Sequence, residues 1–385
     1  MKILFYLPVV TPWWFTELLT PLIRSLHGDA ELHVMVAPIW RNTGIEGDHL
    51  APLADLDGIH WHVIDHEDPD LFRRDGAAVP GLLDLVHEIA PDLTIARSAD
   101  FTTPMQFPGL VRYLMEGWLP PFAITSLSLM LEPQPFRLGV MPEGSDALID
   151  ACTDALGDLW SAPAAIRTPI LRQDWRTALG LPAQRPILAV PLAYEHEECY
   201  FQETSAFPRG LDLLLNLLNS IDPQVFLAVT DHPLNRKYVD RSDIAALIAE
   251  VPERAALCVL DDVPGGPTGI LAVRGDAMLV EQGKSWATAA YCGTPMLHFG
   301  NSDTAGWLNC AELDFASGTP WSPETLRKPD MDAARRFFSW HFGTRVFDPG
   351  NVSLDRLIAH VNGTTGADVI DANMAVLRDN YRVAA

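Results

Sequence analysis

One turn in the second half of the chain brings an imidazole ring close to two cations. The apolar run 224–230 ends in the string DHPLNRK, which starts at residue 231. Pro233 fixes the turn, so the ring N–H of His232 can reach an anion or a sugar oxygen. Arg236 and Lys237 can add charge-assisted hydrogen bonds to a phosphate. The alternative, which the string alone leaves open, is a strand-ending turn with a surface histidine.

A second apolar run ends at Glu281 and leads through the turn QGKS into a helix of small residues from Ser285 to Tyr291. Ser285 suits the N-cap of this helix, and the free N–H groups beyond it, with Lys284 beside them, are typical of a phosphate site. The alternative is an ordinary strand–helix–strand unit in which Ser285 is only a cap. The string GKS lacks the upstream glycine spacing of a P-loop, which excludes that motif.

The loop that follows residue 193 is rich in carboxylates. It reads YEHEE and places Glu195, Glu197 and Glu198 around His196. Like charges this close, in a cleft, would raise the pKa of one carboxyl group and suit it to general acid or base catalysis. A solvated acidic loop is the alternative, and the spacing expected of a structural metal site is absent.

Residues 96–122 of the first half mix polar and aromatic side chains. The charged members include Arg97, Asp100, Arg112 and Glu116. Aromatic rings with a few polar groups suit stacking on a sugar or holding a hydrophobic acceptor tail. Core packing is the alternative, and we expect it for Phe107 and Tyr113. Trp13 and Trp14 lie on the first strand-to-helix loop and so face the cleft that the following elements predict.

Strand-like and helix-like runs alternate along the whole chain, which indicates parallel sheets with crossover helices. The predicted strands are 2–9, 32–38, 59–65, 93–98 and 122–129, then 186–193, 225–232, 255–262, 276–282 and 294–300. The predicted helices include 15–28, 77–91, 210–221, 243–252, 351–363 and 370–385. Two doubly wound, Rossmann-like halves face a cleft in this α/β arrangement, and ligands bind at the carboxyl ends of the strands.

Proline, alanine and arginine accumulate over residues 159–186, where the periodicity fades. We place the domain boundary there, with one Rossmann-like domain at 1–170 and a second at 171–350. The helical end, 351–385, is expected to pack back on the first domain.

Composition excludes several classes of protein. The 385 residues carry a formal net charge of −23, from 27 basic and 50 acidic residues, which disfavours nucleic-acid binding. The five cysteines stand singly, which favours reduced thiols in a cytoplasmic protein. No apolar run is long enough to span a membrane, although contact with a membrane surface stays open.

Other catalytic and metal-binding motifs are missing from the sequence. No GxSxG elbow supports an α/β-hydrolase, and no GxGxxG follows the first strand as in a dinucleotide oxidoreductase. Five histidines in the first half show no HExxH or facial-triad spacing, and we expect them to pack or to lie on the surface: His27, His33, His60, His62 and His66. The sequence therefore predicts no metal site.

Taken in order, the loops PLAYEHEE, DHP and EQGKSWATAAYCGTP resemble those of GT-B glycosyltransferases. More narrowly, they are similar to the capsule polysaccharide biosynthesis group that includes bacterial Kdo transferases. The resemblance covers about residues 186–301, and the first half matches only as a generic acceptor domain. It implies a metal-independent transferase whose second domain binds a nucleotide sugar.

The resemblance also implies roles for individual residues. His232 and Pro233 match the contact to the donor phosphate, and Lys284, Ser285 and Thr288 match the start of the donor-binding helix. Glu197 stands where that group has a catalytic aspartate. A further departure is Ala193, which stands where the group has glutamine, so the donor is left open among CMP-, UDP- and GDP-linked sugars.

Together these observations predict a cytoplasmic glycosyltransferase of bacterial surface polysaccharide synthesis. The expected catalytic residues are Glu197, with Asp100 and Glu116 across the cleft. The expected donor-binding residues are His232, Pro233, Arg236, Lys237, Glu281, Lys284, Ser285 and Thr288. The acceptor is expected to be a glycan or a lipid-linked glycan, and a lipid-linked acceptor would bring the protein to the inner membrane surface.

Three alternatives remain open at this point. A transferase of the same fold could move glycerol phosphate, and an epimerase of that fold could act on a nucleotide sugar. A non-catalytic GT-B-like protein could bind a glycan or a partner enzyme, which the altered positions Ala193 and Glu197 favour.

Overall fold

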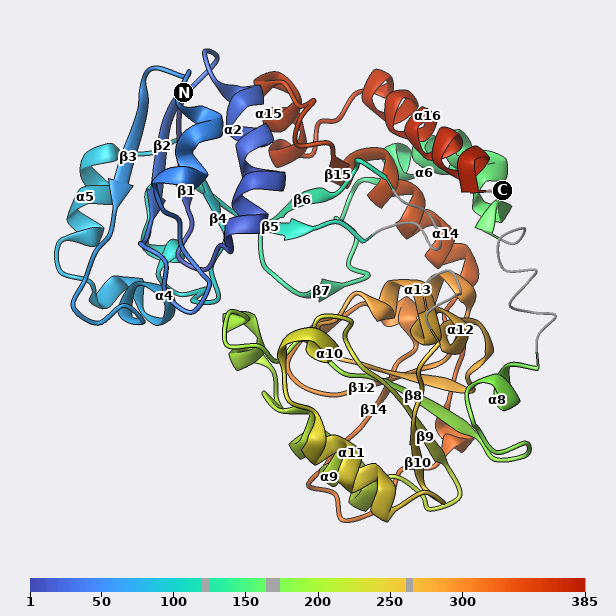
Figure 1. Cartoon of the computed structure of the whole chain (residues 1–385). Coiled ribbons are helices and arrows are strands. Elements are labelled where there is room, and N and C mark those ends of the chain that lie inside the picture. The colour runs from blue at the N-terminus through green and yellow to red at the C-terminus, as the bar shows by residue number, and fades with distance from the viewer. Residues whose placement is uncertain (119–124, 164–173, 261–265, 385) are drawn as a thin grey trace.

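The computed structural model describes residues 1–118, 125–163, 174–260 and 266–384, and it contains two large sheets in separate halves of the molecule (Figure 1). The first sheet has seven strands in the order β15-β6-β5-β4-β1-β2-β3. Their bounds are β1 Lys2–Tyr6, β2 Glu31–Val36, β3 Ile59–Val63, β4 Leu93–Ala96, β5 Leu110–Glu116, β6 Leu129–Glu132 and β15 Val346–Phe347. The strands from β3 to β5 are parallel, whereas β6 and β15 join antiparallel.

Helices cover both faces of the first sheet, which explains why β1 is apolar along nearly its whole length. The helices of this half are α1 Pro12–Trp14, α2 Thr20–Leu26, α3 Gly47–Leu50, α4 Leu71–Arg74 and α5 Leu82–Ile89. Ile3 and Phe5 pack with α2 on one face, and Leu4 and Tyr6 pack with α4 and α5 on the other. All four of these side chains are fully buried.

The second sheet has six parallel strands in the order β10-β9-β8-β11-β12-β14. Their bounds are β8 Ile187–Pro191, β9 Phe226–Thr230, β10 Ala255–Leu257, β11 Ala277–Val280, β12 Met296–His298 and β14 Ala311–Glu312. The helices around it are α8 Trp175–Ala178, α9 Gly210–Ser220, α10 Asn235–Tyr238, α11 Ser242–Glu250, α12 Gly266–Arg274 and α13 Ser285–Cys292. Helices α9 and α11 pack on one face, and α12 and α13 pack on the other.

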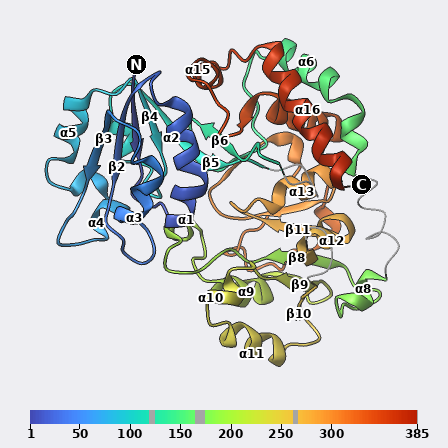
Figure 2. The ribbon, with the colours of Figure 1, turned by 45° about the horizontal axis from the view of Figure 1, so that its top comes forward.

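Counted within each sheet, the parallel strands follow the order 3-2-1-4-5 in both halves, and β14 adds a sixth strand to the second. This is the doubly wound arrangement, in which the strand order reverses beside the first strand. The predicted fold class, two Rossmann-like domains facing a cleft as in GT-B proteins, is confirmed. The views in Figures 1 and 2 agree that the two sheets occupy separate halves of the molecule.

The end of the chain crosses back to the first half. Helix α14 (Met331–Trp340) packs against α6 (Asp146–Leu156), and a π-helical turn then leads into β15 of the first sheet. Helices α15 (Leu354–Asn362) and α16 (Ala367–Ala384) follow. Side chains of α6, α14 and α16 share one apolar core with α12 and α13 of the second half. This shared core joins the two halves.

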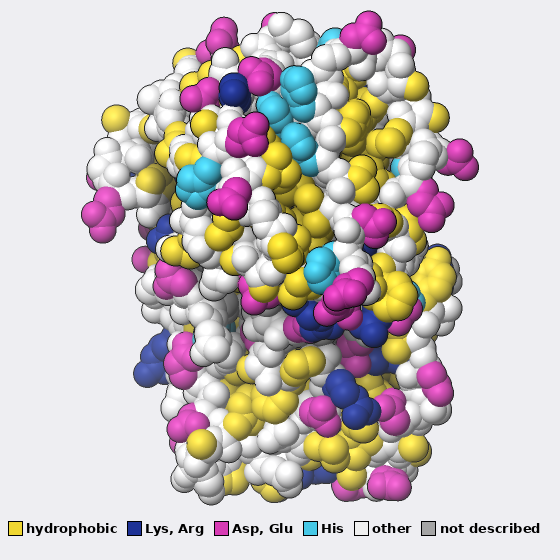
Figure 3. Space-filling model, turned by 90° about the vertical axis from the view of Figure 1, so that its left-hand side faces the viewer, with side chains coloured by type: hydrophobic (Ala, Val, Ile, Leu, Met, Phe, Trp, Pro, Cys, Tyr) yellow, Lys and Arg dark blue, Asp and Glu magenta, His cyan; other side chains and the backbone are white. Residues whose placement is uncertain are grey.

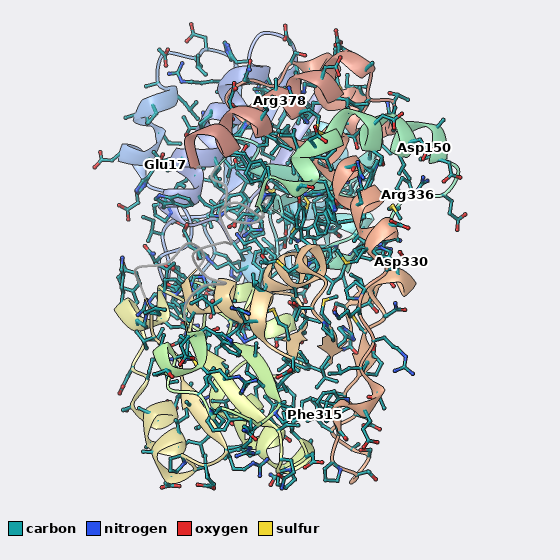
Figure 4. The ribbon with its side chains drawn as sticks, turned by 90° about the vertical axis from the view of Figure 1, so that its right-hand side faces the viewer. Glu17, Asp150, Phe315, Asp330, Arg336 and Arg378 are labelled. Atoms are coloured by element: carbon teal, nitrogen blue, oxygen red, sulfur yellow. The ribbon has the colours of Figure 1, made fainter. Side chains whose placement is uncertain are left out.

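Polar contacts support the same junction. Arg336 of α14 points toward α6, where it pairs with Asp150 and, at 2.9 Å, with Asp146 (Figure 4). Asp330 caps α14 by accepting hydrogen bonds from two backbone N–H groups. A small parallel pair, β7 (Arg137–Leu138) with β13 (Asp303–Thr304), adds a second link between the halves.

Most predicted strands and helices are present with shorter bounds, but one prediction was wrong in part. Residues 125–128 of the predicted strand 122–129 are irregular, and residues 122–124 lie outside the described residues. Strands β5 and β6 flank that segment instead. The predicted boundary between residues 170 and 171 also lies outside the described residues. Residues 346–347, inside the range assigned to the second domain, pair in the first sheet.

Candidate functional site

A cavity of about 1050 Å³ lies between the two sheets, at the carboxyl ends of their parallel strands. Ligands of doubly wound folds bind at this edge, and large concave sites commonly form between domains. We call the loops after β8, β9 and β11 the C-terminal wall. The N-terminal wall consists of the loops after β1 and β4, the end of β5, and Phe136 and Leu138.

The turn after β9 is held by a partly buried network of charges. Asp231 accepts hydrogen bonds from the Arg241 guanidinium at 2.9 and 3.0 Å, and Arg241 also lies 3.0 Å from a carboxylate oxygen of Glu195. Asn235 is fully buried, and its amide group bonds Asp231, the Ala193 carbonyl and the Glu195 N–H. These contacts fix the loops after β8 and β9 relative to each other.

His232 lies on this fixed turn with one ring nitrogen free for a ligand. Its Nδ1 accepts the backbone N–H of Leu234 at 3.3 Å, so Nε2 carries the proton in the neutral ring. Burial lowers the pKa of His232, and this effect outweighs the opposing charge of Asp231. The lowered pKa favours the neutral ring. No group in the described part of the chain accepts a hydrogen bond from Nε2. Both His232 and Pro233 line the cavity.

The three carboxylates of the acidic loop point to different places. Glu195 pairs with Arg241, whereas Glu197 is exposed, lies 3.8 Å from Arg41 and does not line the cavity. Glu198 lines the cavity and accepts a 2.6 Å hydrogen bond from the Tyr194 hydroxyl. The expected cluster of like charges is therefore spread over three sites: Glu195 and Glu198 line the cavity, and Glu197 does not.

The loop after β11 brings Glu281, Lys284 and Ser285 to the cavity. Glu281 accepts hydrogen bonds from the Ser205 hydroxyl at 2.6 Å and from the Ala206 N–H at 2.7 Å. These bonds lower its pKa, but burial raises the pKa by more. Glu281 thus holds a neighbouring loop. Gly300 has a φ of +86°, and a Cβ there would lie 2.7 Å from Glu281 Oε1, so glycine leaves room for that carboxylate.

The start of α13 differs from its prediction. Lys284 occupies the N-cap position and Ser285 is the first helical residue, and neither side chain caps the helix. The prediction that Ser285 is the N-cap was therefore wrong. Burial, with repulsion from Arg97, lowers the pKa of Lys284 to about 8. Its ammonium pairs with Glu116 of the opposite wall.

Arg97 is the cation of the N-terminal wall. Its guanidinium lies between the ring of Trp14 on the same wall and the ring of Phe201 on the C-terminal wall, with centroid distances of 4.2 and 4.3 Å. Burial lowers its pKa to about 10. Nη1 donates to the Leu114 carbonyl at 3.3 Å, and Arg97 has no ion-pair partner among the described residues. Because Arg97 lines the cavity, its remaining N–H groups are available to a ligand.

Glu116 stands at the end of β5, where it accepts a 3.2 Å hydrogen bond from Trp14 Nε1 and pairs with Lys284. The carboxylate thus joins the two walls. Trp13 also lines the cavity and is 63% exposed, which leaves its indole ring open to a ligand.

Four of the predicted site residues do not line the cavity, in addition to Glu197: Asp100, Arg236, Lys237 and Thr288. Arg236 and Lys237 are exposed on α10, and Thr288 lies one turn into α13.

Asp100 is buried and accepts hydrogen bonds from the backbone of Gly76, Thr102 and Thr103. Burial raises its pKa, but hydrogen bonds from Thr103 and Thr102 outweigh that effect and lower it. Asp100 therefore stabilises a turn.

The sequence prediction missed Arg97, Glu198 and Arg241 as site residues. A signal existed for Arg97, since it follows a predicted strand directly. The acidic loop is irregular, so its sequence could not show which of Glu197 and Glu198 faces the cavity. Arg241 gave no signal, because its partners are 10 and 46 positions earlier in the chain.

Comparison with models of known protein families gave no match, and comparison with curated proteins gave none either. Solved structures match at the level of the fold. A Thermosulfurimonas dismutans KpsC β-Kdo 2,7-transferase is 13% identical over 80% of this chain and 92% of its own, with a TM-score of 0.41. The ADP-heptose heptosyltransferase II of E. coli is 14% identical over 94% of this chain and 98% of its own, with a TM-score of 0.27.

A third structure, the UDP-GlcNAc 2-epimerase of Neisseria meningitidis, is 12% identical over the whole of both chains, with a TM-score of 0.28. These proteins have different activities and their overall similarity to this chain is low. We therefore base no functional assignment on them. The strand order and the facing sheets define a GT-B architecture in their own right.

Proposed function

We propose that this protein is a glycosyltransferase that binds a nucleotide sugar on the C-terminal wall and its acceptor on the N-terminal wall. The observation that carries the proposal is that His232 and Lys284 line the same cavity. His232 lies in the loop after β9 and Lys284 in the loop after β11, on either side of β8, one as a neutral N–H donor and the other as an ammonium. A hydrogen-bond donor and a cation together suit a phosphate group.

The donor phosphate binds next to Lys284 and the start of α13. Neither Lys284 nor Ser285 caps this helix with its side chain, so the first N–H groups remain available to an anion. His232 donates Nε2–H to a second phosphate or sugar oxygen. The partly buried Asp231–Arg241 pair holds that turn rigid before the ligand arrives, which lowers the entropy lost on binding.

Donor binding frees the catalytic carboxylate. In this structure Lys284 pairs with Glu116, so a phosphate that attracts the ammonium weakens that pair. Glu116 can then accept the proton of an acceptor hydroxyl as general base. The hydroxyl oxygen forms a bond to the anomeric carbon, the bond from that carbon to the phosphate oxygen breaks, and the electron pair leaves with the nucleotide. Lys284 and His232 stabilise the charge that develops there.

The acceptor binds among the rings of the N-terminal wall. Trp13 offers an open indole face, and Arg97 offers N–H groups between two fixed rings. Aromatic faces with a few fixed donors suit a sugar hydroxyl array. A glycan acceptor, free or lipid-linked, fits this wall.

The test is release of nucleotide from CMP-, UDP- and GDP-linked sugars, with a panel of glycan acceptors. One donor class should turn over, and Glu116→Gln should lower the rate by about 100- to 10,000-fold. The matched control is Glu197→Gln, an exposed carboxylate outside the cavity, which should keep the wild-type rate. Tight nucleotide binding without turnover of any donor would contradict an enzyme and favour a binding protein of the same fold.

A further inference from the structure

Four side chains with metal-binding groups gather at the edge of the first sheet, away from the cavity. We call Glu31, His33, His60 and His62 the histidine cluster. Strands β2 and β3 are parallel, with His33 opposite His60 and Met35 opposite His62. Side chains two apart on one strand share a face, and so do partners in register, so all four lie on the same face. Histidine side chains gather on the upper part of the surface that contains this half (Figure 3).

The distances within the cluster are short. His33 Nε2 lies 3.0 Å from Glu31 Oε1, and His33 Nδ1 lies 3.0 Å from His62 Nε2. The rings of His33 and His60 stack with centroids 4.6 Å apart. One ligand atom from each of Glu31, His33 and His60 lies within 4.8 Å of the others. These three groups converge on one small volume.

We propose that Glu31, His33 and His60 bind a divalent transition-metal ion such as Zn²⁺. Zinc bonds to imidazole nitrogen and carboxylate oxygen at about 2.0–2.2 Å, which places tetrahedral ligand atoms roughly 3.3 Å apart. Small side-chain rotations bring the cluster to that spacing. Two imidazoles and a carboxylate suit zinc, nickel or copper better than magnesium or calcium, and three protein ligands leave a position for water.

His62 positions the central ligand. A histidine that binds metal through Nε2 must keep its proton on Nδ1, and a neighbouring acceptor fixes that form. His62 Nε2 is such an acceptor for His33 Nδ1. Without metal, the reversed proton arrangement, from His62 to His33 to Glu31, satisfies the same contacts. Binding of the ion therefore requires a shift of protons and little movement of the chain.

One cation already lies beside the cluster. Lys2 Nζ is 3.7 Å from Glu31 Oε1 and donates to the Ile89 carbonyl at 3.0 Å. A bound ion would share Glu31 with this ammonium, which lowers the affinity but leaves the two histidines unchanged. The ligands come from β2 and from β3, the edge strand of the sheet, so the ion cross-links that edge to its neighbour.

The test is a calorimetric titration of the chelator-stripped protein with Zn²⁺ alone. The wild type should bind one ion more per chain than His60→Ala. Glu31→Gln should bind that ion at least about tenfold more weakly, and His62→Ala about 10- to 100-fold more weakly. His60 and Glu31 are exposed, so both variants should fold. The control, His66→Ala, changes a histidine of the following loop that contacts Asp68, and it should bind as the wild type does.

A second readout reports the ligands directly. Co²⁺ in place of Zn²⁺ should give the visible absorption of a low-coordinate nitrogen and oxygen site in the wild type and in His66→Ala. The absorption should be lost in His60→Ala. Equal Zn²⁺ stoichiometry and affinity in the wild type, His60→Ala and Glu31→Gln would overturn the proposal. Because the cluster does not line the cavity, either result leaves the proposed transferase function unaffected.

Discussion

The two walls of the cavity are built in different ways. On the C-terminal wall, partly buried charges pair with one another: Asp231 and Glu195 share Arg241, and the free donor His232 stands on the turn they fix. On the N-terminal wall, Arg97 lies between Trp14 of the same wall and Phe201 of the opposite wall, without an ion-pair partner among the described residues. The C-terminal wall is therefore held by polar bonds within itself, whereas Arg97 of the N-terminal wall packs against a ring from each wall.

The proposed function assigns a different ligand to each wall. A phosphate needs donors that are already in place, because reorganising polar groups costs binding free energy. A glycan acceptor varies between proteins of one fold and is bound by ring faces and a few polar groups. Charged side chains of both signs meet across the middle of the surface shown in Figure 3, between the two halves. Lys284 and Glu116 make such a contact inside the cavity.

The largest effect is expected from Arg241→Ala. Removing this guanidinium leaves the partly buried carboxylates Asp231 and Glu195 without a counter-charge, which should lower the free energy of unfolding by up to about 3–5 kcal/mol. Urea denaturation measures the loss. The control Arg209→Ala breaks an exposed pair with Asp243 and should cost less than about 1 kcal/mol. Equal losses would mean that the C-terminal wall is not held by its partly buried charges.

Lys284→Met should weaken nucleotide binding by about 1.5–3 kcal/mol, since it removes a charge-assisted bond to phosphate. Isothermal titration with the preferred nucleotide measures the change. Lys237→Met is the matched control, because Lys237 is exposed on α10 and does not line the cavity. An equal loss in both variants would point to a general electrostatic effect in place of a specific contact.

The pH dependence of nucleotide binding should follow Lys284. Burial lowers its pKa to about 8, so the ammonium is present below that pH and is lost as the pH rises through it. The dissociation constant should be level near pH 7 and should rise about tenfold per pH unit above 8. Lys284→Met should show no such rise. A level profile in the wild type from pH 7 to 9.5 would contradict the role of this ammonium.

The smallest effect is expected from Arg97→Met. This change keeps an unbranched side chain between Trp14 and Phe201 but removes two cation–π contacts, which should cost about 1–2 kcal/mol of stability. Nucleotide affinity at pH 7 should stay within about twofold of the wild type. Because Arg97 helps to lower the pKa of Lys284, the pH at which binding weakens should move upward. A large loss of nucleotide affinity at pH 7 would place Arg97 on the donor side.

Local sequence predicted the central strands well. Strands β1, β8 and β9 are short apolar runs buried on both faces, and such runs stand out. Strand β5 was missed because Arg112 and Glu116 interrupt its apolar pattern at partly buried positions. Strand β15 has two residues and forms only where the returning chain meets β6, so its own sequence could not reveal it.

The site was predictable where a functional side chain directly follows a buried strand. His232 and Lys284 were predicted in this way, and both line the cavity at the carboxyl end of the second sheet. The sequence prediction chose Glu197, but Glu198 lines the cavity. Adjacent residues of an irregular loop can face opposite ways, so the sequence could not decide between them. The histidine cluster was missed because its members become neighbours only through the register of β2 and β3.

The most direct test of the central claim is a thermal-shift panel of CMP, UDP, GDP, CDP and TDP on the wild type and on His232→Ala. At 100 times its dissociation constant, a nucleotide should stabilise the protein by about 2.7 kcal/mol. The account predicts that one nucleotide raises the melting temperature of the wild type and that His232→Ala abolishes the shift. If no nucleotide shifts the wild type, or if His232→Ala responds equally, the C-terminal wall is not a nucleotide-sugar site.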